Sequence, residues 1–251
     1  MAAVELYVDA TGDPEGPPVA FIHGFMSSNH QWDLNRARLG AKLRMLLIEQ
    51  PGHGSSPAST EPDDYAPEAV IPALERVREQ HGVERWWMVG HSMGGAVALR
   101  YALAHPERVL GVIFTNSKAA FGVGRADAAD EQLPQLETRD DLRALPFHPI
   151  HAKRFPAELQ ARMVAKADSI PPIALTNVMR VALQWRSIGE PGSFSMPVLL
   201  VNGRWEKAFQ PCVPDALAAI PHLHVVDLEG GHSVNIEAAR EFDEAVLDFI
   251  G

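Results

Sequence analysis

One serine lies in a five-residue pattern that is typical of nucleophilic catalysis. Residues 90–94 read Gly-His-Ser-Met-Gly, which places Ser92 at the centre. The apolar run 85–89 before it has the character of a buried strand, and residues 95–104 after it favour a helix. A sharp turn between a strand and a helix exposes a serine hydroxyl at the carboxyl end of the strand. The pattern predicts Ser92 as a nucleophile, and the alternative is a serine that only caps the helix.

A serine hydroxyl is a weak nucleophile near neutral pH, so a base has to accept its proton. The strand expected at residues 223–228 runs into two glycines and then His232, which sets this histidine apart from the others in the chain. A carboxylate has to orient such a base. Glu206 lies in the loop after the apolar run 197–203. The chain order Ser92, Glu206, His232 is known for serines at strand-to-helix turns.

Two backbone amides are candidates for stabilising a developing oxyanion. One donor in such sites is the N–H of the residue after the nucleophile, which here is Met93. A second comes from the loop after an early strand. The strand expected at residues 18–22 ends in His-Gly-Phe, which points to the N–H of Phe25. Gly24 lets this loop pass close to the serine.

Taken together, these segments resemble the α/β-hydrolase fold family over nearly the whole chain. The resemblance also rests on residues 50–55, which read Gln-Pro-Gly-His-Gly-Ser. It implies a catalytic triad of Ser92, Glu206 and His232. Members with this layout include carboxylesterases, lactonases, carbon–carbon bond hydrolases and synthases, so the resemblance is more specific for the fold than for the reaction.

The acid of the triad is the member for which rivals exist. Most members of the family have aspartate where this chain has Glu206. Asp227 and Glu229 lie nearby, on the strand or turn that leads to the histidine. Other members place the acid after the strand that precedes the cap, but residues 115–117 of this chain read Thr-Asn-Ser and offer no carboxylate. We therefore expect Glu206 to be the acid.

Apolar strands alternate with amphipathic helices along the chain, which predicts an α/β fold with a mostly parallel central sheet flanked by helices. Ligands bind such sheets outside the carboxyl ends of the strands, where the candidate catalytic residues all lie. The expected strands span residues 4–8, 18–22, 43–49, 86–90, 109–115, 197–202 and 223–228, and the expected helices span 67–81, 93–105, 211–220 and 235–249.

This alternation breaks between residues 119 and 194, where prolines interrupt short helices expected at 158–167 and 176–187. The resemblance identifies this stretch as a helical cap inserted into a hydrolase core of residues 1–118 and 195–251. A cap would cover the serine and shape the substrate pocket. His148 and His151, within it, are expected to have surface or structural roles. Candidate pocket residues, which can equally form the cap's own core, are Phe121, Phe147, Met163, Met179 and Trp185.

Composition excludes several classes of function. The chain has 251 residues and a net charge of −10, which argues against nucleic acid as a partner. It has no apolar stretch long enough to span a membrane and no signal peptide pattern at its start. Its one cysteine, Cys212, cannot form an internal disulfide, which favours the cytoplasm. We expect a small-molecule substrate and neither a metal nor a cofactor, and the oligomeric state stays open.

The predicted reaction is hydrolysis of a carboxylic ester or lactone through an acyl-enzyme on Ser92. A carbon–carbon bond hydrolase of ring-fission products is the enzymatic alternative, although it needs a way to protonate a carbon leaving group that the sequence does not reveal. A ligand receptor with slow turnover on the same fold is an alternative of another class. Hydrolysis of a chromogenic short-chain ester would separate an enzyme from a receptor.

Overall fold

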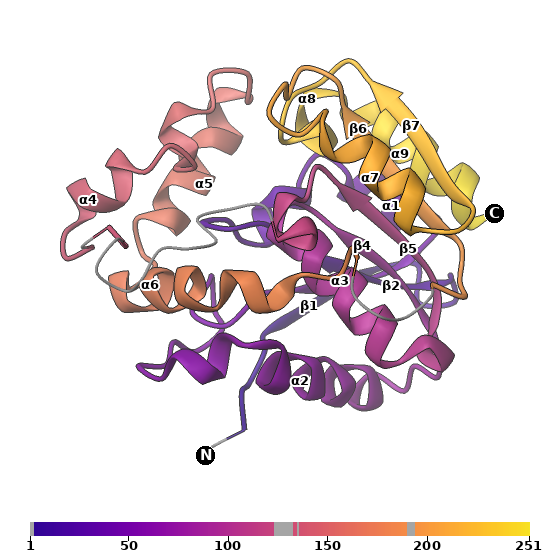
Figure 1. The fold of residues 1–251 in the computed structure, drawn as a ribbon, viewed down its shortest axis with the longest axis horizontal. Helices are drawn as coiled ribbons and strands as arrows, with labels where there is room; N and C mark the ends of the chain where they lie inside the picture. The colour runs from indigo at the N-terminus through magenta and orange to yellow at the C-terminus, as the bar shows by residue number, and fades with distance from the viewer. Residues whose placement is uncertain (1–2, 123–132, 135, 190–193) are drawn as a thin grey trace.

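A seven-stranded sheet with helices on both faces forms the centre of the computed structural model (Figure 1). The structure describes residues 3–122, 133–134, 136–189 and 194–251. The strand order is β1-β3-β2-β4-β5-β6-β7, with β1 antiparallel to β3 and every other pair parallel. This architecture confirms the predicted fold class. The strands are β1 (Val8–Gly12), β2 (Pro18–Ile22), β3 (Arg44–Ile48), β4 (Trp86–Gly90), β5 (Val109–Thr115), β6 (Val198–Gly203) and β7 (Leu223–Leu228).

The first strand begins later than its apolar pattern predicts. The expectation was residues 4–8, but the ladder with β3 runs from the pair Val8 and Ile48 to the pair Gly12 and Arg44. The paired segment is an edge strand with a half-exposed, largely polar sequence. Its position is therefore set by the partner strand, which local hydrophobicity does not reveal.

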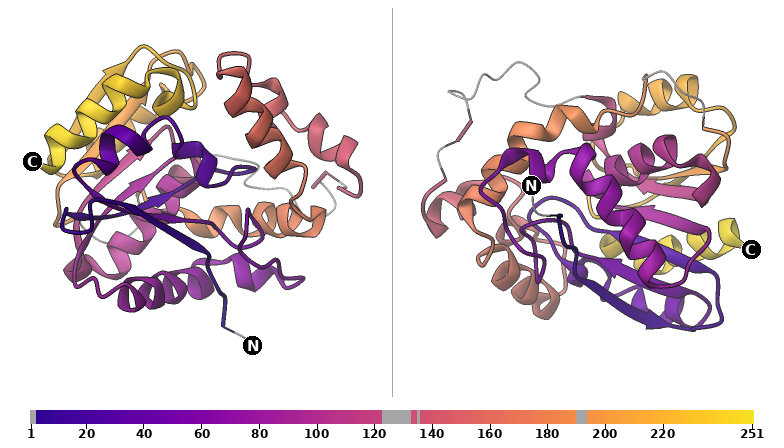
Figure 2. Two further views of the ribbon diagram at one scale, coloured as in Figure 1. Left: turned by 180° about the vertical axis from the view of Figure 1, so that it is seen from behind. Right: turned by 90° about the horizontal axis from the view of Figure 1, so that it is seen from below.

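Two apolar clusters cover the two faces of the sheet, because side chains of successive strand residues point to opposite faces. On one face, Met88 and Phe114 pack with α2 (Pro67–Gln80), α3 (Met93–Ala104) and α7 (Cys212–Ala219). On the other face, strand residues such as Val89 pack against α1 (Arg36–Gly40) and α9 (Ala239–Ile250). Figure 2 shows these two layers from behind and from below.

The last predicted helix, residues 235–249, is divided in the structure. It consists of α8 (Val234–Glu237) and α9 (Ala239–Ile250), separated by Ala238 at φ −133° and ψ 53°. This backbone conformation is not helical, so the chain changes direction between the two helices. Within the part of the chain that the structure describes, no helix is both long and apolar enough to cross a bilayer.

The described residues between β5 and β6 form helices and turns without a strand, and we call them the helical segment. It contains α4 (Arg139–Ala144), α5 (Ala157–Ala167) and α6 (Pro172–Val181), which gather at one end of the sheet in Figure 1. Prolines begin α5 and α6, where the missing N–H costs nothing. The predicted helix at 176–187 starts within α6 and continues into the 3-10 turn Ala182–Trp185.

A buried carboxyl group lies between α9 and the loop before α1. Asp243 is 2% exposed and accepts a 2.8 Å hydrogen bond from the Asn35 amide, which also donates to the backbone oxygen of Asn235. Burial raises the pKa of Asp243 to about 7, because the charged form loses its hydration. The proton therefore stays on the folded protein over a range where the unfolded chain has released it.

We expect Asp243→Asn to stabilise the protein, relative to the wild type, more at pH 7.5 than at pH 4.5. In that window the unfolded carboxyl ionises first, so this group lowers the stability of the wild type as pH rises. Asparagine keeps the oxygen that accepts from Asn35 and removes the titration. Urea denaturation should give the variant an advantage of about 1–3 kcal/mol that grows from pH 4.5 to 7.5. The exposed Asp248→Asn on the same helix is the control, and an equal pH dependence in both variants would contradict this prediction.

Candidate active site

Ser92 occupies a strained turn between β4 and α3. Its backbone has φ 53° and ψ −118°, a region that side-chain-bearing residues adopt rarely. Glycine is needed on both sides: a Cβ on Gly90 would lie 2.3 Å from the backbone oxygen of Gly94, and one on Gly94 would lie 2.1 Å from that of Ile22. The close packing of α3 against β2 and β4 therefore explains the spacing of the two glycines around Ser92.

His232 connects the serine to a carboxylate. Its Nε2 lies 2.9 Å from Ser92 Oγ, and its Nδ1 lies 2.9 Å from Glu206 Oε2. Because an ionised carboxylate only accepts hydrogen bonds, the Nδ1 atom carries the proton and Nε2 is free to accept from the serine hydroxyl. The rings of His91 and His232 pack edge to face, with centroids 5.0 Å apart. The structure thus brings together the three residues predicted from three distant segments.

Asn116 is a residue of this site that the sequence reasoning passed over. Its amide nitrogen donates to Glu206 Oε2 at 2.7 Å, the same oxygen that accepts from His232. The amide oxygen accepts from the Gly203 N–H at 2.9 Å, and the side chain is fully buried. Asn116 therefore orients Glu206 from the neighbouring strand end. Its position directly after a predicted strand was the only available signal.

The rival carboxylates have other partners. Asp227 accepts from the Asn202 amide at 2.8 Å. Glu229 forms a 2.9 Å ion pair with Arg204 and accepts from the indole N–H of Trp205 at 2.7 Å. The carboxylate that contacts His232 is Glu206, in line with the expectation for the acid.

Met93 directly follows the serine, and the loop that carries Phe25 passes close to it. Met93 is the first residue of α3, so its N–H has no partner within the helix. Gly24 packs so closely that a Cβ there would lie 3.2 Å from the Cβ of Ser92, which brings the following residue beside the nucleophile. This arrangement can direct two N–H groups at one oxygen.

Three buried histidines, His23, His53 and His91, lie near the loop that follows β2. His23 donates from Nδ1 to the backbone oxygen of Gly24 and accepts the N–H of Gln50 at Nε2. Burial lowers the pKa of His23 to about 4 and that of His53 to about 3, and it holds the pKa of His91 well below its usual range. Near neutral pH these rings are therefore uncharged scaffold groups, as the buried hydrogen bonds also indicate.

The predicted pocket residues differ in how deeply their side chains are buried. Phe147 is 66% exposed and packs edge to face on Phe25, with centroids 6.2 Å apart, so it lies next to the loop after β2. Phe121 packs on the ring of Phe209. Met163 and Trp185 are buried in apolar clusters, and Met179 is partly buried. Whether these side chains line a pocket stays a prediction.

The two histidines of the helical segment have local partners. His148 is buried, accepts the N–H of Ile150 and has its Nε2 3.3 Å from Asp168. His151 donates from Nε2 to the backbone oxygen of Arg143 at 2.8 Å. Both contacts are structural. Among the described residues, no group of three or more His, Cys, Asp or Glu side chains could hold a metal ion.

We expect the rings of His23 and His53 to stay neutral from pH 8 to pH 5. Their pKa values are about 4 and about 3, whereas the unfolded chain takes up these protons near pH 6.5. The two histidines therefore lower stability as pH falls below that value. Histidine ring resonances in NMR spectra, assigned with His23→Gln and His53→Gln, should not move in the folded protein and should titrate in urea. A midpoint near 6.5 in the folded state would contradict this.

Comparison with known proteins gives the chain a family. The model of the alpha/beta hydrolase fold matches residues 17–189. The chain is 31% identical to 2-succinyl-6-hydroxy-2,4-cyclohexadiene-1-carboxylate synthase of Serratia proteamaculans over 95% of each protein. It is 26% identical to the magnesium-chelatase 30 kDa subunit of Rhodobacter capsulatus, covering 100% of this chain and 92% of that protein.

Solved structures agree on the fold. Est816, described as an N-acyl homoserine lactone degrading enzyme, superposes with a TM-score of 0.80 and 23% identity, covering 98% of this chain and 97% of that chain. Identity at this level carries the fold rather than the reaction. The family match spans more than half of the chain and coincides with the strand–turn–helix around Ser92. This chain belongs to the α/β-hydrolase fold family.

Proposed function

We propose that the protein is a serine hydrolase that cleaves a carboxylic ester or lactone of a small molecule. The proposal is carried by one observation, the continuous hydrogen-bonded chain from Ser92 Oγ through His232 to Glu206. A hydroxyl, a base and a fixed acid in this order match the requirements of nucleophilic acyl transfer.

In the proposed reaction, His232 takes the proton of Ser92 as Oγ attacks the substrate carbonyl. The N–H groups of Phe25 and Met93 stabilise the resulting oxyanion, each contributing on the order of 3 kcal/mol to the lowering of the barrier. The imidazolium, stabilised by Glu206, protonates the leaving alcohol. Water then attacks the acyl-enzyme, with His232 acting again as base, and releases the acid.

The helical segment is proposed as the cap, covering residues 119–194 as predicted, although part of that range lies outside the described residues. The exposed ring of Phe147, packed edge to face on Phe25, supports an apolar entrance beside the proposed oxyanion loop. An apolar small molecule suits such a wall, and the negative net charge disfavours polyanionic ligands. We also propose a cytoplasmic location, supported by the single cysteine.

A second candidate is chemistry at carbon, and the match to the Serratia proteamaculans synthase supports it. The same serine–histidine pair can remove a proton from a substrate without forming an acyl-enzyme. The alternatives of a carbon–carbon bond hydrolase and a slow ligand receptor can be tested by the same experiment. Trapping of an acyl-enzyme by mass spectrometry during ester turnover separates the proposed hydrolase from all three.

Ser92→Ala should abolish hydrolysis and leave the fold intact, because it removes one oxygen at a partly exposed turn. We expect kcat to fall by at least about 10³-fold, as for loss of a nucleophile. An organophosphonate should label the wild type at Ser92, which peptide mapping would locate. An active alanine variant, or labelling at another residue, would refute the assignment, and circular dichroism is the control for folding.

Glu206→Gln should lower kcat by about 10²–10³-fold, equivalent to about 3–4 kcal/mol. The amide keeps the volume but removes the charge and can favour the wrong tautomer of His232. Glu206→Asp should retain part of the activity because it keeps the charge. Asp227→Asn and Glu229→Gln are the matched controls, and each should cost far less. If Asp227→Asn is the damaging change instead, the acid is wrongly assigned while Ser92 and His232 stand.

A further inference from the structure

The loops that carry His232 and Glu206 meet at one arginine of the helical segment. Arg154 lies just before α5, outside the central sheet. Its NH1 atom is 3.1 Å from Glu237 Oε2, and its guanidinium carbon is 4.8 Å from the ring centroid of Trp205. Trp205 directly precedes Glu206, and Glu237 lies in α8, five residues after His232. A single cation thus contacts both loops.

Glu237 transmits this contact to the histidine. Its Oε2 also accepts the N–H of Gly231 at 3.1 Å, and Gly231 is the residue before His232. The fit is close, because a Cβ on Gly231 would lie 2.9 Å from Glu237 Oε1 and 3.2 Å from Arg154 NH1. The carboxylate is 9% exposed, so its charge is largely removed from water and needs a partner. Arg154 is the partner that the structure provides.

The acid loop is joined to the same point. The N–H of Trp205 donates to the backbone oxygen of Gly230 at 2.9 Å, and its indole N–H donates to Glu229. The guanidinium of Arg154 lies over this ring in a cation–π contact. The planar guanidinium can contact the Trp205 ring and the Glu237 carboxylate at the same time, which the ammonium group of a lysine would do less well.

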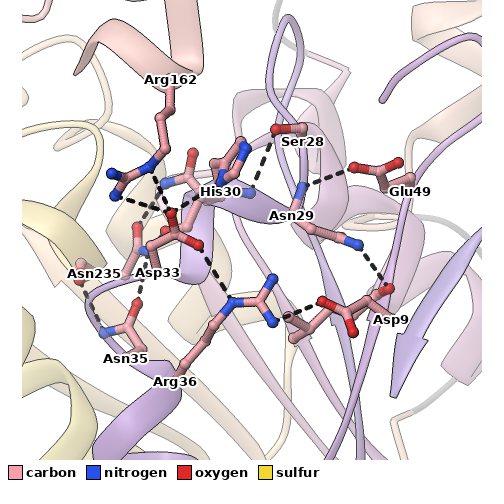
Figure 3. Close-up of polar contacts among 12 residues, drawn as sticks. Asp9, Ser28, Asn29, His30, Asp33, Asn35, Arg36, Glu49, Arg162 and Asn235 are labelled. Carbon is pink, nitrogen blue, oxygen red and sulfur yellow. Dashed lines mark hydrogen bonds and ion pairs between the residues drawn. The ribbon is translucent and has the colours of Figure 1, made fainter. Parts of the chain in front are cut away.

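Helix α5 is docked beside this contact by apolar side chains. Leu159 and Met163 pack with Ile236 of α8, the neighbour of Glu237. An arginine within α5 has a different partner: Figure 3 shows Arg162 reaching Asp33, with Nε 3.2 Å from its Oδ2. Arg162 touches neither the His232 loop nor the Glu206 loop in these contacts, which makes it a natural control.

We infer that Arg154 is a positioning residue of the reaction, whose guanidinium holds the His232 and Glu206 loops in register while α5 is docked. This inference rests on the proposed function, because it assigns the two loops their roles in acyl transfer. Arg154 acts through its contacts with Glu237 and Trp205. Its effect is on geometry, since small displacements of a catalytic base lower the rate strongly.

The first test is independent of turnover. The proton shared by His232 Nδ1 and Glu206 should give a far-downfield NMR signal in the wild type, and Glu206→Gln identifies it. Arg154→Ala should broaden or remove this signal, because the two loops lose their common contact. Arg162→Ala removes an arginine from α5 that contacts Asp33, and this variant should retain the downfield signal.

The second test is kinetic. Arg154→Ala should lower kcat for a chromogenic ester, and the rate of phosphonate labelling at Ser92, by about five- to tenfold with KM changed less than about twofold. Arg154→Ala should also lower the melting temperature modestly, because Glu237 would keep a largely buried charge without its partner, so rates are compared well below the unfolding transition. Glu237→Gln should reproduce the loss, and the double variant should add nothing to it, because the two residues act as one unit. Arg154→Lys should recover only part of the rate.

The outcomes separate the two proposals. Equal effects of Arg154→Ala and Arg162→Ala would mean that docking of α5 as a whole matters, and would overturn the inference. An unchanged downfield signal and unchanged kcat in Arg154→Ala would overturn it as well. If the wild type fails to hydrolyse esters or to react with the phosphonate, the proposed function falls, while the NMR comparison still decides the role of Arg154 in positioning the histidine.

Discussion

The close approach of the first turn of α3 to the ends of β2 and β4 is the constraint on which the site depends. Gly94 touches the backbone oxygen of Ile22, and no side chain fits between them. This contact forces the chain through the strained conformation at Ser92 and brings the loop after β2 beside it. The cost, of order 1–3 kcal/mol for such a conformation, is offset by the buried strands around it. The conformation of Ser92 and the nearness of the loop after β2 are thus consequences of one packing contact.

Polar groups behind this turn make the packing possible. His91 shares a hydrogen bond with the Thr115 hydroxyl, and His23 satisfies both of its ring nitrogens with backbone groups. Buried polar atoms that lack partners are costly, so these bonds allow histidines to fill space beneath the site. Because burial keeps their pKa values low, they add no positive charge next to His232. The base can then become charged during reaction without close repulsion.

Local pattern was sufficient where structure is determined by neighbouring residues. The strands at 18–22, 86–90 and 109–115 are found as predicted, because buried parallel strands have continuous apolar runs, and the half-exposed edge strand at 223–228 is found as predicted too. It failed where a distant partner decides. The first strand is placed by pairing with β3, and the predicted last helix is divided at Ala238. Neither feature can be predicted from the local residue pattern.

The same distinction applies within the site. Ser92 and His232 can be predicted because glycines mark their turns in the sequence, whereas the position of Asn116 after a strand does not specify its role. An amide after a strand serves equally well as a cap, a turn residue or a hydrogen-bond donor. The pairing of β5 with β6 brings Asn116 to Glu206, and the pairing of β6 with β7 brings the carboxylate next to His232. Two adjacent strand ends thus determine where the Glu206 carboxylate lies, and the hydrogen bond from Asn116 restrains the longer side chain that stands where the family usually has aspartate.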